Sequence, residues 1–180
     1  MMKLGLSLDD CDVFYLRKPG GGLAPERLDE VQMLLWRGHC SVHGRFTADS
    51  VDDVRERIPG VNVIVHPECR HEVAIKADAI GSTEGIIKTI SAAEPGSSWA
   101  VGTELNLVKR LALENPDKNI AFLDKTVCYC STMNRIDLPH FTWAMESLAE
   151  GRIVNQITVD DETAHWARVA LDRMLALPGV

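Results

Sequence analysis

The sequence lacks a long apolar run, and no stretch approaches the roughly 18–20 residues that a membrane-spanning helix needs. It also lacks a stripe of basic residues, since the net charge is −7 and the isoelectric point is about 5.3. Proteins that bind nucleic acid through its phosphates carry such a stripe, so nucleic acid is not an expected partner. Residues 1–6 show no further part of a signal peptide. We therefore expect a cytoplasmic protein that contacts no membrane.

Tyrosine and cysteine are both scarce. The chain has two tyrosines and five cysteines among 180 residues. An odd number of cysteines does not form a complete disulfide framework, and in a reducing compartment such residues are more often ligands, catalysts or core residues. With 46% hydrophobic and 25% charged residues, the composition is that of a globular protein with one domain or two small ones.

Short apolar segments alternate with helical patterns along the chain. The predicted strands are residues 31–36, 61–65, 99–102 and 120–123, with 153–159 as a further candidate. The predicted helices are residues 47–58, 71–77, 82–93, 104–115, 137–150 and 160–177, with a short one from Pro25. The predicted caps are Thr47 or Ser50 for the first of these, and Asp137 and Asp160 for the last two; the helix from Glu104 lies directly behind Thr103. Residues 1–22 show no clear element. This alternation predicts an α/β fold of βα units around a parallel sheet.

Reactive side chains recur just after the predicted strands. Cys40 and His43 follow the first strand, and His66 and Glu68 follow the second. Ligands of α/β proteins bind outside the carboxyl ends of the strands, so these side chains predict a site at that edge. Pro67 forces the chain to turn, and the His–Glu pair offers an acid and a base near neutral pH. The plainer alternative for the first pair is a buried thiol and a surface imidazole.

Three further segments carry candidate groups. Ser82 and Thr83 begin a predicted helix, where free N–H groups and hydroxyls bind anions; simple helix capping is the alternative. Cys69 lies at a predicted helix start, where the helix dipole is expected to lower its pKa. Cys128 and Cys130 are two residues apart, so in an extended segment they point in opposite directions and only one faces a given site.

Together these motifs resemble quinolinate synthase, the iron–sulfur enzyme of de novo NAD biosynthesis. The matching stretches are Trp36-Arg-Gly-His-Cys40-Ser-Val-His43, His66-Pro67-Glu68-Cys69, Gly81-Ser82-Thr83, Val101-Gly-Thr103-Glu104 and Cys130-Ser-Thr-Met133. The resemblance implies three similar three-layer, Rossmann-like α/β domains around a pseudo-threefold axis. It implies an enzyme, a transferase, that condenses iminoaspartate with dihydroxyacetone phosphate to quinolinate, with loss of phosphate and water.

The resemblance also implies roles for individual residues. Cys40 and Cys130 match two of the three cysteines that hold a 4Fe-4S cluster, whereas Cys69 and Cys128 are extra. Glu68 and His66 match residues suited to catalysis. The implied substrate-binding residues are His43, His66, Glu68, Ser82 and Thr83.

Only about the C-terminal half of the family's chain is matched. Residues 1–40 would end the second domain, residues 41–132 would form the third, and residues 133–180 would be a helical tail that packs on the missing first domain. The family's His-Tyr-Tyr motif and first-domain cysteine are absent. Cys11 lies in an acidic run, Asp9 to Asp12, which is expected at the surface and disfavours a thiolate.

These absences lead us to expect an inactive chain when it is alone. The expected partners are a separate N-terminal half or the L-aspartate oxidase that supplies iminoaspartate. Two alternatives stay open. One is a non-catalytic remnant of the same fold that binds a metabolite or a partner, and the other is a thiolate zinc-binding domain.

Overall fold

The computed structural model describes residues 6–7, 9–125, 130 and 132–177. The chain divides into two compact units, residues 1–130 and 131–180, which are described separately below. The finer division at residues 40 and 132 stays a prediction. Within the described ranges, no helix combines the length and the apolar character that crossing a bilayer requires.

A parallel sheet forms the centre of the first unit. Its strands are β3 (Asn62–Val65), β4 (Ala79–Ile80), β5 (Ser98–Gly102) and β6 (Asn119–Phe122), in the order β4-β3-β5-β6. The helices between and around them are α2 (Ala48–Arg57), α3 (His71–Ala74), α4 (Thr83–Ser91) and α5 (Leu105–Glu114). The predicted α/β class is confirmed, and the short edge strand β4 is an addition to the predicted elements.

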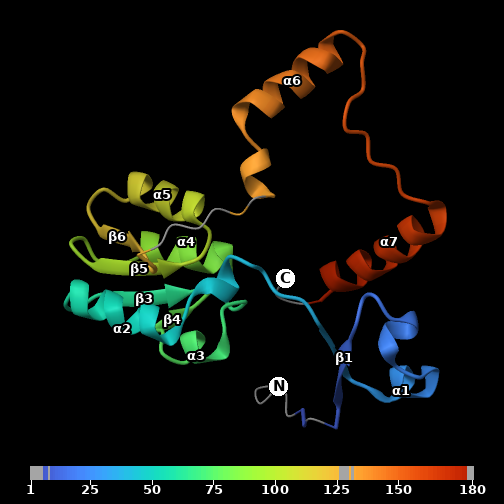
Figure 1. The fold of residues 1–180 in the computed structure, drawn as a ribbon, viewed down its shortest axis with the longest axis horizontal. Coiled ribbons are helices and arrows are strands. Elements are labelled where there is room, and N and C mark those ends of the chain that lie inside the picture. Colours follow the sequence, from blue (N-terminus) through green and yellow to red (C-terminus); the bar gives the residue numbers. More distant parts are fainter. Residues whose placement is uncertain (1–5, 8, 126–129, 131, 178–180) are drawn as a thin grey trace. The chain divides into compact units, whose positions relative to one another are not determined.

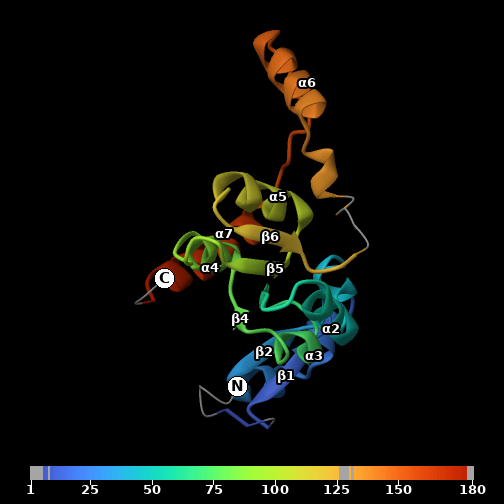
Figure 2. The same ribbon diagram turned by 90° about the vertical axis from the view of Figure 1, so that its left-hand side faces the viewer.

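The sheet is covered on both faces, which gives three layers (Figures 1 and 2). Successive side chains of a strand point to opposite faces, and β3 shows this directly. Val63 and Val65 belong to an apolar cluster with side chains of α2 and α3, whereas Ile64 belongs to a cluster with side chains of α4 and α5. A strand buried on both faces reads as a continuous apolar run, as residues Val63, Ile64 and Val65 of β3 do.

The strand order reverses between β3 and β5. From β3 the chain passes through α3 to β4 on one side, and then through α4 to β5 on the other side of β3. Val65 is paired with Gly102, so the carboxyl ends of the two strands are adjacent. The His66 N–H donates to the Gly102 carbonyl at 3.0 Å and continues the ladder by one bond. Such a switch point is where ligands bind in open α/β sheets.

Side-chain caps fix where the helices begin. Of the two predicted caps of α2, Thr47 is the N-cap, and Ser50 completes a reciprocal capping box with it. Ser82 caps α4 by accepting the Gly85 N–H at 3.2 Å. At α5 the helix begins at Leu105, one residue after the predicted start at Glu104. The cap is Glu104, whose carboxylate accepts the Asn106 N–H at 2.8 Å, and this leaves the Thr103 hydroxyl available for other contacts.

Before the sheet, β1 (Cys11–Phe14) pairs in parallel with β2 (Met33–Trp36), with a 3₁₀ turn η2 (Pro19–Gly22) and helix α1 (Pro25–Glu30) between them. The expectation of no element before residue 22 is therefore wrong. The strand predicted at residues 31–36 is present as β2, but its predicted burial is wrong, because β2 pairs with β1 alone among the described residues and Trp36 is 60% exposed.

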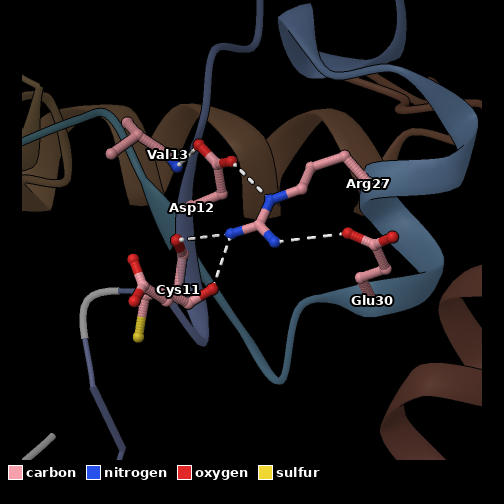
Figure 3. Close-up of polar contacts among 6 residues, drawn as sticks. Cys11, Asp12, Val13, Arg27 and Glu30 are labelled. Atoms are coloured by element: carbon pink, nitrogen blue, oxygen red, sulfur yellow. Dashed lines mark hydrogen bonds and ion pairs between the residues drawn. The ribbon is translucent and has the colours of Figure 1, made fainter.

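Arg27 of α1 ties the helix to β1 (Figure 3). Its guanidinium donates to the Asp12 carboxylate at 3.1 Å and to the Cys11 carbonyl at 3.3 Å. The hydrogen bond from the Val13 N–H, followed by the one from Arg27, lowers the pKa of Asp12. Cys11 itself is 8% exposed, so its predicted place at the surface is wrong.

The second unit holds a 3₁₀ turn η4 (Met133–Arg135) and the helices α6 (Leu138–Ala149) and α7 (Asp161–Leu175). Asp137 and Asp160 cap the two helices as predicted, each accepting a backbone N–H at 2.8 Å. Residues 153–159 are not a strand, since residues 132–177 of this unit provide no neighbouring strand with which they could pair. Both helices carry exposed apolar side chains, which include Phe141, Trp143, Met145, Leu148 and Trp166.

Candidate active site

The turn after β3 holds two of the predicted site residues. The Cys69 N–H donates to the His66 carbonyl at 3.0 Å and closes the turn that Pro67 enforces. The Glu68 N–H donates to His66 Nδ1 at 3.3 Å. His66 Nδ1 is therefore an acceptor, and in the neutral ring the proton lies on Nε2. The rigid turn predicted from the sequence is confirmed.

His43 lies in a 3₁₀ turn, η3 (His43–Arg45), and is buried, so the alternative of a surface imidazole is wrong. Its Nδ1 is 2.9 Å from the Glu68 carboxylate, and its Nε2 is 3.3 Å from the Thr103 hydroxyl. The ring stacks on His66 with centroids 4.3 Å apart and planes 7° from parallel. Residues 25 and 60 positions from His43 in the sequence thus meet on one imidazole.

Burial and the neighbouring ring set the charge of His66. Desolvation is the largest cause that lowers the pKa of His66, the charge of His43 lowers it further, and the Glu68 carboxylate opposes both. Two stacked imidazolium ions would repel each other, which is why the charge of His43 disfavours the charged form of His66. Near neutral pH, His66 is a neutral ring that presents an Nε2–H donor.

Cys40 stands at the edge of this group. It is half-buried and lines a cavity of about 410 Å³ together with Gly38, His39 and Glu68. The Cys40 sulfur, a ring nitrogen of His43 and a Glu68 oxygen lie within 4.8 Å of one another. A second cavity of about 430 Å³ shares His39 and Glu68 with the first and adds Arg45 and Arg70. Thiolate, imidazole and carboxylate together suit a soft or borderline metal.

Cys69 is in a different environment. It is buried in the apolar cluster, and its sulfur is 3.5 Å from the Gly102 carbonyl oxygen. Burial is the largest cause that raises the pKa of this thiol to about 12. The predicted lowering by a helix dipole is wrong, because α3 begins two residues later, at His71, and has only four residues.

Ser82 and Thr83 follow β4, the neighbour of β3, and so begin α4 at the carboxyl edge of the sheet. Both side chains are exposed, and the Ser82 hydroxyl caps the helix. Cys130 is half-buried. Cys128 lies outside the described residues.

Thr103 is the site residue that the sequence analysis missed. The sequence places it only in a matching stretch before the predicted helix from Glu104, whereas in the structure its hydroxyl is the partner of His43 Nε2 and the residue is buried. The available signal was its position directly after β5, the strand next to β3. The structure thus joins His43, His66, Glu68 and Thr103, with Cys40 beside them.

Comparison with known proteins finds one matching family model and several similar proteins. A family model described as "Quinolinate synthetase A protein" matches residues 19–176. The quinolinate synthase of Nocardioides sp. (strain ATCC BAA-499 / JS614) is 66% identical over 179 residues, which are 99% of this chain and 45% of the relative. That of Streptomyces coelicolor is 66% identical over 177 residues, 97% of this chain and 45% of the relative.

A third relative is more distant. The quinolinate synthase of Geobacillus kaustophilus is 57% identical over 174 residues, which cover 97% of this chain and 47% of that protein. The chain therefore spans about half the length of the curated relatives it matches.

Proposed function

The chain belongs to the quinolinate synthase family, and on that premise we propose that it forms part of an enzyme that makes quinolinate in de novo NAD biosynthesis. The reaction condenses iminoaspartate with dihydroxyacetone phosphate and releases phosphate and water. Because the chain spans 45% of its relatives, this activity requires the remainder of the protein. We place the reaction in the cytoplasm, with a separate N-terminal half and the L-aspartate oxidase that supplies iminoaspartate as partners.

One observation carries the proposal. Glu68 stands at the switch point of the sheet, held by the His43 ring at 2.9 Å, while its side chain is 56% exposed. A carboxylate that is oriented from one side and open on the other can take a proton from a substrate and return it. Glu68 is thus the proposed general acid/base. His66, neutral and with its Nε2–H available, donates a hydrogen bond to a substrate oxygen.

The remaining substrate contacts are proposed from the positions of residues near Glu68 and at the carboxyl edge of the sheet. Ser82 and Thr83 are proposed to hold the phosphate or a carboxylate at the start of α4, where hydroxyls and free N–H groups favour anions. His43 is proposed as a substrate-binding residue as well. Since Glu68 and Thr103 occupy both of its nitrogens, a direct contact through nitrogen would require one of these bonds to open.

The family implies a 4Fe-4S cluster, and the chain's thiols fit it in part. Cys40 is half-buried at a cavity and Cys130 is half-buried in its loop, so both are proposed ligands. Cys69 and Cys11 are buried and are not proposed as ligands. When bound, the cluster supplies a Lewis-acidic iron. A third thiolate has to come from the rest of the protein.

The exposed apolar side chains support a role for the second unit as a docking element. We assign residues 1–40 to a second domain, residues 41–132 to a third, and residues 133–180 to a helical tail that packs on the absent first domain. Burial of side chains such as Phe141, Trp143 and Trp166 against that domain would remove apolar surface from water.

A second candidate function rests on the donor set. Cys40, His43 and Glu68 place a sulfur, a nitrogen and an oxygen within 4.8 Å, which suits Zn²⁺. Under this alternative the chain is a thiolate zinc-binding domain.

A chimera separates the two functions. The part of the Nocardioides relative that this chain does not match is joined to the chain, and the product is reconstituted anaerobically with iron and sulfide. We expect quinolinate from the chimera, none from the 180-residue chain, and a loss of about 10²–10⁴ in turnover on Glu68→Gln. Glu72→Gln is the matched control, since Glu72 is exposed and lies outside the site. Stoichiometric zinc without quinolinate formation in the chimera would support the alternative.

A further inference from the structure

The carboxyl ends of β1 and β2 carry three basic side chains without an acidic partner. Phe14 and Trp36, the last residues of these two parallel strands, are paired, so the strand ends are adjacent. Arg17 and Lys18 follow β1, and Arg37 follows β2. Within the described ranges, none of these three cations forms an ion pair with a carboxylate. Because the net charge of the chain is −7, this local group of cations runs against the charge of the whole.

The three cations share one cavity of about 350 Å³. It is lined by Tyr15, Leu16, Arg17, Lys18, Trp36 and Arg37. The Lys18 ammonium lies 4.5 Å from the centroid of the Tyr15 ring, and the Arg37 guanidinium carbon lies 5.2 Å from the same centroid. Attraction to an aromatic face holds cations in such positions. The Phe14 ring stacks on Trp36 with centroids 6.1 Å apart. The cavity thus combines positive charge with aromatic walls.

Backbone hydrogen bonds hold the basic segments in place. The Arg37 N–H donates to the Phe14 carbonyl at 3.0 Å and continues the β1–β2 ladder by one bond. The Tyr15 N–H donates to the Gly21 carbonyl at 3.0 Å and closes the loop that carries the other two cations. Gly21 has a φ of +69°, and a Cβ at this position would overlap the Phe14 ring, so glycine is required for the loop to pack on β1. A cavity fixed in this way loses little conformational freedom when a ligand binds.

The charge and the walls of the cavity indicate the class of ligand. A phosphate monoester carries a charge of about −1.5 to −2 near neutral pH, which suits a group of three cations. Guanidinium groups bind phosphate oxygens through paired N–H donors. The volume is within the range of small-molecule sites, and the aromatic walls suit an organic group beside the phosphate. We infer that this cavity binds an organic phosphate monoester, with the basic side chains on the phosphate and Trp36 against the organic part.

The cavity adjoins the candidate active site. Trp36 lines it and also lines the cavity that contains Cys40 and Glu68. The phosphate therefore has two possible sources. One is the dihydroxyacetone phosphate of the proposed reaction, and the other is a nucleotide whose base stacks on Trp36. The inference does not depend on the proposed function, because binding is measured in the 180-residue chain without any assay of activity.

Isothermal titration calorimetry and the indole N–H resonance of Trp36 test the cavity. The probes are dihydroxyacetone phosphate, AMP and inorganic phosphate, and Trp36→Phe identifies the resonance. We expect at least one organic phosphate to bind with a Kd below about 1 mM and to shift the Trp36 resonance. Inorganic phosphate should bind about tenfold more weakly, because it makes no contact with the aromatic walls. Tighter binding of dihydroxyacetone phosphate supports the substrate as the source, and tighter binding of AMP supports a nucleotide.

Variants assign the binding to this cavity rather than to Ser82 and Thr83. Arg17→Gln/Arg37→Gln should weaken binding about 10- to 100-fold, since charge-assisted hydrogen bonds are lost. Lys18→Gln, measured separately, should weaken it as well. Arg110→Gln is the matched control and should leave the Kd unchanged, because Arg110 is an exposed residue of α5 that pairs with Glu114. The ¹H–¹⁵N spectrum of each variant checks that it is folded.

Three results would overturn the inference. The first is the absence of binding of both organic phosphates below about 5 mM, or equal binding of inorganic phosphate. The second is an affinity that Arg17→Gln/Arg37→Gln and Lys18→Gln retain in full. The third is binding by the 180-residue chain that disappears in the chimera, since the remainder of the protein would then fill the cavity. A chimera that binds the phosphate but makes no quinolinate would contradict the proposed function alone.

Discussion

Cys69 is predicted to resist alkylation in the folded chain. Its side chain is 7% exposed and lies among Val65, Val73 and other apolar residues, with the sulfur 3.5 Å from the Gly102 carbonyl oxygen. Burial raises the pKa of this thiol from its ordinary 9.0 to about 12. The neutral thiol is thus strongly favoured over the thiolate, which is the form that reacts.

The size of the effect follows from the two pKa values. At about pH 8, a thiol with a pKa of 9.0 is about one-tenth thiolate, whereas one with a pKa of about 12 is about one ten-thousandth thiolate. Since only the thiolate attacks iodoacetamide, Cys69 should react about a thousandfold more slowly than the same residue in the unfolded chain. Restricted access in the core slows it further.

The assay is labelling with iodoacetamide under reducing, metal-free conditions, followed by proteolysis and mass spectrometry. The rate for Cys69 is measured in the native chain and in guanidinium, and the unfolded sample also serves as the control for peptide detection. Half-buried Cys40 reports whether reagent reaches the cavity in the native chain. A native rate for Cys69 within tenfold of its unfolded rate would refute the reasoning, and with it the exclusion of Cys69 as a cluster ligand.

Three further predictions address the cluster, the histidine pair and the core. In the reconstituted chimera, Cys40→Ala or Cys130→Ala should abolish the visible absorption of the cluster, and Cys69→Ala should retain it; equal loss in all three would contradict the assignment. Because the pKa of His66 is lowered in the folded state, the unfolded chain binds more protons, so the free energy of unfolding should fall as the pH drops below about 6.5. Urea unfolding at several pH values should show a weaker pH dependence of this free energy in His66→Gln. Ile64→Ala should lower the free energy of unfolding by about 2–5 kcal/mol and Ile64→Val by about 0.5–1.5 kcal/mol, because Ile64 is fully buried. A denaturant titration that shows no difference between the two variants would count against the packing described.

Most helices of this chain could be predicted from the sequence, because the hydrogen bonds that cap them join residues close together in the sequence. Thr47, Asp137 and Asp160 accept backbone N–H groups of the next turn in the structure as they were predicted to do. These bonds span three residues, so a short window of sequence contains all the partners. The central strand β3 was equally accessible, since its run of branched apolar residues is typical of a strand buried on both faces.

Predictions about burial depended on partners that are distant in sequence, and here local patterns misled. The acidic neighbours of Cys11 predicted a place at the surface, whereas Cys11 is buried in the strand β1. The apolar β2 was expected in a core and is exposed, since β1 is its one strand partner among the described residues. Cys69 was assigned a lowered pKa from a helix start, and burial against the sheet raised it instead.

The sequence by itself determined the α/β class, the turn at Pro67, and the residue types at the strand ends, because alternation of apolar residues and the geometry of proline are local properties. Only the tertiary structure decided that Thr103 and Glu68 share the His43 ring. That contact exists because β5 crosses over to lie beside β3, and it brings together groups 60 positions apart. Pairing of distant strands depends on the packing of the whole sheet, and no local pattern encodes which hydroxyl comes to lie against which imidazole.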